Sequence, residues 1–133
     1  MTRVLVQTAE ALLTIDAEEG VVEIEAGGGL EAPPDVPTSL PSVRACVASG
    51  STLVALVDRR PPLVVSHDAG RTWHETGAGL PPGWAIAIDP DNPDRILFAA
   101  RHRVWLSTDG GRFWDSLALD LPEIEAVAFA TEA

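Results

Sequence analysis

Basic side chains concentrate in two short segments of an otherwise acidic chain, DRRPP (58–62) and ARHR (100–103). A guanidinium group binds an oxyanion through a planar fork of N–H donors, so this cluster suits a carboxylate, sulfate or phosphate. The alternative is that these are solvated turn residues paired with nearby acids, which contributes little stability. The candidate anion-binding residues are Arg59, Arg60, Arg101, His102 and Arg103.

No residue pattern assigns a catalytic centre. Glycoside hydrolysis needs two carboxylates facing each other across a cleft, and none of the many acids matches a recognisable motif. The acids within 89–94 favour turn chemistry over calcium, because their loop holds two prolines and lacks the EF-hand glycine and terminal Glu. His67, His74 and His102 are not at metal-ligand spacing on one strand face. We interpret Cys46 as an ordinary small buried thiol. We therefore predict no catalytic residue, metal or cofactor.

Composition and net charge limit the kinds of partner and the cellular location that we expect for this chain. The chain has 133 residues with 20 Asp and Glu, nine Arg and no Lys, for a net charge of −11. This net negative charge argues against binding to nucleic acid, whose phosphates it would repel, and is compatible with a well-solvated surface or a basic partner. The 46% hydrophobic content suffices for one domain core, whereas the apolar runs are too short to cross a membrane. With one cysteine and no secretory signal, we expect a cytoplasmic protein.

Two eight-residue turns repeat along the chain, SHDAGRTW at 66–73 and STDGGRFW at 107–114. A repeat with a period of 20–50 residues is typical of stacked structural units. Three short strands are predicted before each turn, and one strand begins with the Trp that closes the turn. The predicted strands of the two units are 43–49, 52–57, 63–65 and 72–76, followed by 84–89, 95–100, 104–106 and 113–119.

The two ends of the chain together supply a third unit. The N-terminal segment matches strands two to four of a unit, whereas segment 124–130 resembles a first strand. The N-terminal unit has a worn copy of the turn, in which Thr14 and Asp16 hold the places of the Ser and Asp. The N-terminal strands are predicted at 4–9, 11–16 and 21–26. Twelve strands therefore make three units, one of them split between the termini.

The residue types in the repeated turn have physical roles. The Asp accepts hydrogen bonds from backbone N–H groups of its own turn, and the Ser adds a hydroxyl bond. The Gly adopts a positive φ, and the Trp packs its large apolar surface between adjacent sheets. The turn therefore acts as a structural staple. The residues concerned are Ser66, Asp68, Gly70, Trp73, Ser107, Asp109, Gly111 and Trp114.

This pattern, Ser/Thr-x-Asp-x-Gly-x-Thr/Phe-Trp, resembles the Asp-box or BNR repeat of sialidases, sortilin-type receptors, xyloglucan-cleaving glycosidases and photosystem assembly factors. The stretch DPDNPDRILFAA (89–100) is also similar to the segment that precedes the box in that superfamily. The resemblance covers 43–119 well and 1–26 weakly. It implies a β-propeller whose box turns lie away from the active centre. Sialidases use a Tyr nucleophile, and this chain has no Tyr.

The expected fold is all-β, with three propeller blades of four antiparallel strands. The blades comprise 1–26 plus 123–131, 43–77, and 84–119. Propellers typically use about 4–8 blades, so three cannot close a ring. We expect a homodimeric six-bladed ring with strand exchange, in which each C-terminal strand completes the N-terminal blade of the other chain. A nine-bladed ring of three chains and a piece of a longer protein are the alternatives.

The expected function is a non-catalytic binding or assembly scaffold that presents its loops to a protein or an acidic small ligand. One alternative is a glycoside-hydrolase-like propeller whose catalytic site is shared across the dimer. Another is an engineered or evolution-model half-propeller without a ligand. The long loop 27–41 is expected to cover a blade edge or to contact a partner through Leu30, Val36 and Leu40.

Overall fold

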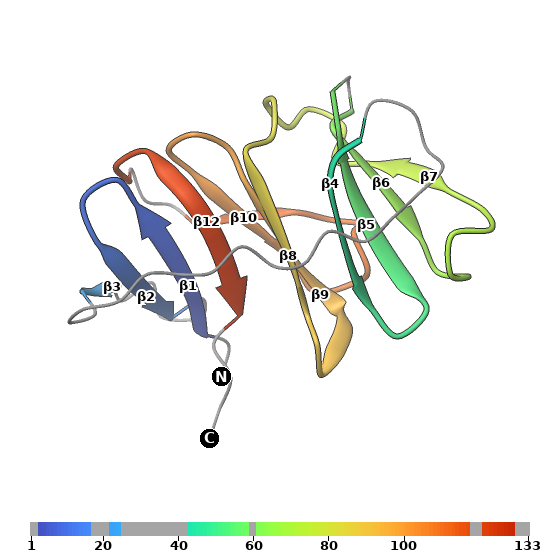
Figure 1. Ribbon diagram of the computed structural model, residues 1–133, viewed down its shortest axis with the longest axis horizontal. Helices are drawn as coiled ribbons and strands as arrows, with labels where there is room; N and C mark the ends of the chain where they lie inside the picture. The colour runs from blue at the N-terminus through green and yellow to red at the C-terminus, as the bar shows by residue number, and fades with distance from the viewer. Residues whose placement is uncertain (1–2, 17–21, 25–42, 59–60, 118–120, 130–133) are drawn as a thin grey trace.

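The computed structural model describes residues 3–16, 22–24, 43–58, 61–117 and 121–129. These residues form twelve β-strands, and no helix occurs among them (Figure 1). The predicted all-β class and the four-stranded antiparallel sheets are confirmed. Within the described ranges no helix is present that could span a membrane. The loop 27–41, with its predicted covering role, lies outside the described residues.

The strands form three sheets of four, and neighbouring strands in each sheet are antiparallel. Sheet A has the order β12-β1-β2-β3, sheet B β4-β5-β6-β7 and sheet C β8-β9-β10-β11. The strands of sheet A are β1 (Arg3–Thr8), β2 (Leu12–Asp16), β3 (Val22–Ile24) and β12 (Ile124–Phe129). Those of sheet B are β4 (Val43–Ser49), β5 (Thr52–Val57), β6 (Leu63–Ser66) and β7 (His74–Thr76). Those of sheet C are β8 (Ala85–Asp89), β9 (Asn92–Ala99), β10 (Val104–Ser107) and β11 (Asp115–Leu117).

Sheet A is completed within one chain. Strand β12 pairs with β1 of the same chain, with Val4 opposite Phe129 and Val6 opposite Val127. The expectation that a second chain supplies this strand is therefore corrected, because the chain's own β12 already occupies the position. The 18 residues between Ile24 and Val43 reach up to about 60 Å when extended. That connection is long enough for one chain to return from sheet A to sheet B without exchange.

The backbone hydrogen bonds identify equivalent faces of the three sheets. In an antiparallel pair, residues alternate between hydrogen-bonded and non-hydrogen-bonded positions, and the two sets point to opposite faces. The hairpin between the second and third strands is closed by the N–H of Val57 in sheet B, Ala100 in sheet C and Thr8 in sheet A. In each sheet, we define the front face as the face that carries this closing residue and every second residue before it on the same strand. The opposite face is the back face.

The sheets stack in one consistent sense, B then C then A. The back face of sheet B packs on the front face of sheet C, with Val54 of the one and Phe98 of the other in a single buried cluster. The back face of sheet C packs on the front face of sheet A, where Leu97 and Val6 share a second cluster. This repeated front-to-back packing is the relation that successive blades of a propeller have. The inner strands β4, β8 and β12 lie next to one another (Figure 1).

Two faces at the ends of this stack meet no sheet within the described residues. The front face of sheet B carries a third cluster, centred on Cys46, Ala55, Val57 and Val64. The back face of sheet A carries half-buried residues around a buried Thr14. Its half-buried members are Leu5, Gln7, Leu12, Ala126 and Ala128. The stack of sheets in one chain therefore has the front face of sheet B at one end and the back face of sheet A at the other.

The worn turn of sheet A is shifted by one residue from the predicted alignment. Ser66 pairs with Leu53 and Ser107 with Ile96, each four residues before the residue that closes its hairpin. Counting four residues back from Thr8 gives Val4, whose partner is Ile15. Ile15 is fully buried, so a hydrophobic contact replaces the Ser hydroxyl at this position. The assignment of Thr14 to the place of the Ser is therefore wrong.

Candidate functional site

The first box turn, 66–73, is closed by its own polar side chains. The Ser66 hydroxyl donates to Asp68 Oδ1 at 2.7 Å and accepts from the Gly70 N–H at 2.8 Å. Asp68 in turn accepts from the Thr72 N–H at 2.8 Å and from the Thr72 hydroxyl at 2.5 Å. Gly70 has φ of +91°, which glycine adopts without strain. Every hydrogen bond of this network stays inside the turn, so these groups are used to hold the backbone.

The second box turn, 107–114, repeats the arrangement. The Ser107 hydroxyl donates to Asp109 Oδ1 at 2.8 Å and accepts from the Gly111 N–H at 2.9 Å. Asp109 accepts from the Phe113 N–H at 3.0 Å. Gly111 has φ of +96°.

The Trp of the second turn joins two sheets. Trp114 Nε1 donates to the Gly111 carbonyl at 3.1 Å and lies 3.3 Å from Thr76 Oγ1, which belongs to sheet B. The Thr76 hydroxyl also donates to the Gly111 carbonyl. The Trp114 ring meets the buried Phe98 ring nearly edge-on, with centroids 6.3 Å apart. Trp73 makes the same bond within its own turn, to Gly70 at 3.1 Å, but packs on the front face of sheet B.

The hydrogen bonds within the turns make stability sensitive to acid. The hydroxyl of Thr72, followed by its N–H, lowers the pKa of Asp68 far below its ordinary value of 3.8, and the N–H of Phe113 lowers the pKa of Asp109. A carboxyl group whose pKa is depressed in the folded state stabilises the fold above its unfolded pKa, and this contribution is lost as pH falls. We expect the free energy of unfolding to decline below about pH 4. Denaturant unfolding between pH 2 and 7 checks this. A double Asp68→Asn, Asp109→Asn variant should show a weaker decline, and an equal one would contradict the assignment.

Ala69 is the one strained residue in the first turn. It has φ of 61°, whereas the second turn has Gly110 at the equivalent position, with φ of 73°. A left-handed conformation costs a residue with a Cβ about 1–2 kcal/mol, and the greater chain entropy of glycine offsets part of this. We expect Ala69→Gly to raise the free energy of unfolding by about 0.5 kcal/mol. Chemical denaturation measures the change, and the reciprocal Gly110→Ala should lower stability. A loss of stability in Ala69→Gly would contradict this account.

The edge of the molecule opposite the box turns carries the described part of the basic cluster. The turns β1–β2 and β9–β10 and the β7–β8 connection lie along this upper edge (Figure 1). Arg101 lies over the ring of Trp84, 5.1 Å from its centroid, and its Nε is 3.7 Å from Glu123 Oε1. Trp84 is 41% exposed. An exposed indole beside a cation provides both a flat apolar surface and positive charge.

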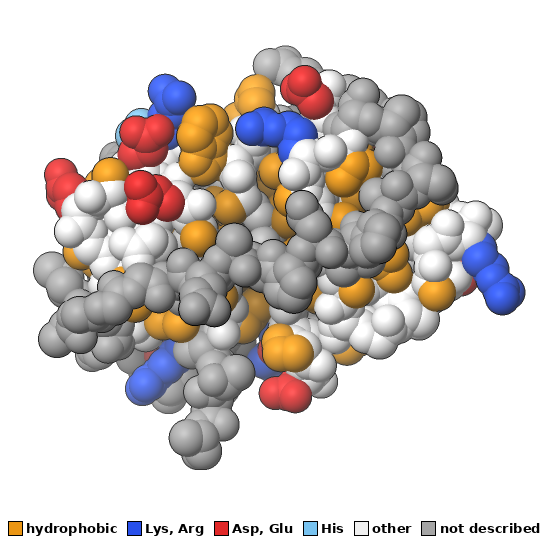
Figure 2. Space-filling view, viewed as in Figure 1, with side chains coloured by type: hydrophobic (Ala, Val, Ile, Leu, Met, Phe, Trp, Pro, Cys, Tyr) orange, Lys and Arg blue, Asp and Glu red, His pale blue; other side chains and the backbone are white. Residues whose placement is uncertain are grey.

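Further polar contacts tie this edge together. Arg44 donates from Nη1 to the Gly83 carbonyl at 3.1 Å, across the junction of sheets B and C. His102 Nδ1 lies at 3.0 Å from the Leu121 carbonyl oxygen, to which it hydrogen-bonds. Arg103 is exposed in the same turn. Charged side chains of both signs lie among hydrophobic ones along the upper part of the surface in Figure 2.

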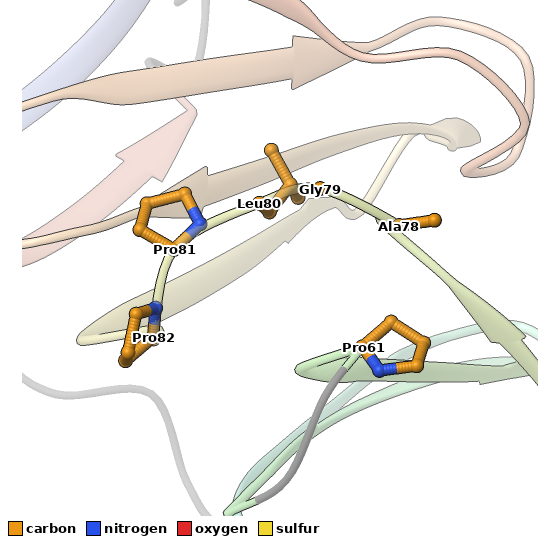
Figure 3. Close-up of a pocket in the computed structure, with 6 residues that line it drawn as sticks. All are labelled: Pro61, Ala78, Gly79, Leu80, Pro81 and Pro82. Atoms are coloured by element: carbon orange, nitrogen blue, oxygen red, sulfur yellow. The ribbon is translucent and has the colours of Figure 1, made fainter.

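An apolar pocket opens beside these residues. Its volume is about 460 Å³, and Pro61 of the β5–β6 turn faces Pro81 and Pro82 of the β7–β8 connection across it (Figure 3). Ala78, Gly79 and Leu80 complete the lining. None of these side chains ionises or acts as a nucleophile, so the pocket offers an apolar surface and supplies no chemistry.

The structure brings together only part of the predicted anion-binding set. Arg101, His102 and Arg103 share one turn, whereas Arg59 and Arg60 lie outside the described residues. Trp84 and Arg44 were missed by the sequence analysis, because nothing in their local pattern indicates which face of the fold they occupy. The described residues contain no group of three or more His, Cys, Asp or Glu side chains arranged to hold a metal ion.

No family model matches the chain, and no curated protein is similar to it in sequence.

Proposed function

We propose that this chain is a non-catalytic scaffold that associates head to tail with a second copy into a closed six-bladed ring. The observation that carries the proposal is the front-to-back stacking of sheets B, C and A, which leaves one front face and one back face at its ends. A surface that is complementary to the other end of the same chain generates a ring when the rotation closes. The resemblance to Asp-box propellers supports the same arrangement. The presence of a single cysteine, Cys46, suits a cytoplasmic location.

The two end faces share part of their residue types with the interfaces already formed. Ala126 and Ala128 occupy in sheet A the positions of Ala85 and Ala87 in sheet C, by their pairing with the second strand. The two sheet C alanines belong to the cluster that packs on β12. The front face of sheet B is apolar. Its cluster residues are at most 3% exposed within one chain, so the proposal requires this face to open toward the second copy. Burial of apolar surface contributes about 25 cal/mol of favourable free energy per Å², before the entropic costs of association are subtracted.

The ring is expected to bind its ligand at the edge that carries Trp84, Arg101 and the proline-lined pocket. This edge combines cationic groups with an apolar hollow, which suits a ligand or protein segment that has both a carboxylate and an apolar part. A two-fold ring presents the combination twice. Among the residues of this edge that the structure describes, none has the pairing of nucleophile and base that catalysis needs.

Light scattering on the purified chain tests the assembly. One chain has a mass of 14.1 kDa, so two give 2 × 14.1 = 28.2 kDa. The proposal predicts the larger mass at micromolar concentration. A single species of 14.1 kDa across the concentration range would overturn it.

Inorganic phosphate is a suitable probe of the basic edge. We expect amide chemical shifts at Arg101–Arg103 to saturate with added phosphate, and the Arg101→Ala, Arg103→Ala variant to weaken binding at least about tenfold, because charged hydrogen bonds contribute about 1.5–3 kcal/mol. Arg112→Ala, an exposed arginine of the second box turn, is the matched control and should bind as the unmodified chain does. If the unmodified chain, the double variant and Arg112→Ala all bound phosphate with equal affinity, the proposed anion site would be wrong.

A further inference from the structure

Two histidines that are separated in sequence meet at the first box turn. His67 follows β6 and His74 begins β7, and the centroids of their rings lie 5.3 Å apart with planes inclined by 33°. Both side chains are exposed. Their spacing in the sequence predicts no metal site, because the turn between these two residues brings them together at a separation that no short motif encodes.

The distance between the rings matches joint coordination of one metal ion. A tetrahedral ion such as Zn²⁺ lies about 2.1 Å from a ligating imidazole nitrogen, hence about 3.2 Å from the ring centre. Two rings bound to one ion at the tetrahedral angle therefore have centroids about 5.2 Å apart. The observed separation of 5.3 Å is close to this value.

The surroundings of His67 orient its ring. Its Nδ1 lies 3.4 Å from the hydroxyl of Thr52, a residue that is 7% exposed. When Nδ1 carries the proton and faces this hydroxyl, the lone pair of Nε2 is free for a metal, which is the usual way that an outer partner fixes a histidine ligand. Gly110 of the second box turn lies close to this ring. If Gly110 carried a Cβ atom, that atom would be 3.7 Å from His67 Nε2 and 3.5 Å from Asp94 Oδ1. His67 Nε2 and the Asp94 carboxylate therefore both lie close to Gly110.

We propose that His67 and His74 bind a divalent transition-metal ion of the zinc or copper class, with water at the remaining positions. The two imidazoles are the protein ligands, since imidazole nitrogen is preferred by these ions and not by Ca²⁺ or Mg²⁺. The site lies at the box turns and away from the anion-binding edge, so it does not rest on the ring or on its ligand. A metal bound here links β6 to β7 and stabilises the outer edge of sheet B.

Calorimetric titration with Zn²⁺ tests the site. We expect one ion per chain, and a loss of affinity of at least about tenfold in His67→Gln and in His74→Gln, because each removes one of two ligands. His102→Gln, a histidine of the opposite edge, is the control and should bind normally. Thr52→Val should weaken binding about 10–100-fold through the orientation of His67.

A spectroscopic readout distinguishes this site from adsorption to surface acids. Electron paramagnetic resonance of bound Cu²⁺ should show two equivalent nitrogen ligands in the unmodified chain and one in either His variant. Because both rings are exposed, the variants should retain the far-ultraviolet circular dichroism of the parent. Absence of Zn²⁺ binding, or binding that either His substitution leaves unchanged, would overturn the proposal.

Discussion

Trp114→Ala is expected to lower the free energy of unfolding by about 3 kcal/mol, the lower end of the range for removing a large aromatic side chain from a packed interface. The indole packs against the cluster between sheets B and C and lies within hydrogen-bond distance of Thr76 of the neighbouring sheet. Its removal leaves a cavity beside Phe98 and takes away one of the two side-chain donors to the Gly111 carbonyl. Urea denaturation followed by circular dichroism measures the loss.

Phe113→Ala provides the matched control. Phe113 is the preceding residue and is also aromatic, but its side chain is 76% exposed. Exposed substitutions of this kind change stability by no more than about 0.5 kcal/mol. Similar effects of the two substitutions would contradict the role of Trp114 as a wedge between sheets.

Ala128→Arg is expected to convert the assembled species from 28.2 kDa, twice the chain mass, to 14.1 kDa. Ala128 lies on the back face of sheet A, opposite Leu5, and in the proposed ring it packs on the apolar front face of sheet B in the other copy. An unpaired charge buried there costs about 3–5 kcal/mol, which weakens association more than about 100-fold. Light scattering at matched concentrations measures the change.

Glu125→Arg serves as the control for charge alone. Glu125 lies on the same strand but is exposed and stands at the irregularity in the β1–β12 pairing. It alters the net charge more than Ala128→Arg does, because it replaces a negative side chain. The ring should persist in this variant. Dissociation by Glu125→Arg, or a persistent dimer in Ala128→Arg, would speak against the proposed interface.

The repeated turns made much of the sheet architecture predictable. Short apolar runs punctuated by Gly and Pro indicated strands, and the turns 66–73 and 107–114 fixed the register of two four-stranded units, because Ser, Asp and Gly are needed at set positions to close them. The likeness of 124–130 to the other first strands placed it beside the N-terminal segment. These inferences depended on local chemistry, which a sequence displays directly.

Features that depend on three-dimensional arrangement could not be predicted from the sequence. Strand exchange was expected because three blades cannot close a ring and one unit is split between the termini, whereas the sequence does not tell which copy supplies the strand that pairs with β1. Thr14 was assigned one position away because the worn turn retains a Thr-x-Asp pattern, whereas the hairpin that sets the register is closed at Thr8. The approach of His67 to His74 and of Arg101 to Trp84 arises from the folding of turns, and periodicity carries no signal of either.

A disulfide trap tests the head-to-tail ring most directly. Cys46 is the chain's one cysteine, is 1% exposed and belongs to the front face of sheet B. Ala126 and Ala128 lie on the back face of sheet A, on the far side of sheet C. A bond between these faces within one chain is excluded, because disulfides need Cα atoms within about 7 Å.

We expect mild oxidation to convert Ala126→Cys or Ala128→Cys into a covalent dimer on a non-reducing gel, and Cys46→Ser to abolish that dimer. Such a result places the front face of one copy against the back face of another. If both cysteine variants remain monomeric after oxidation, or if the covalent dimer survives the loss of Cys46, the ring is contradicted.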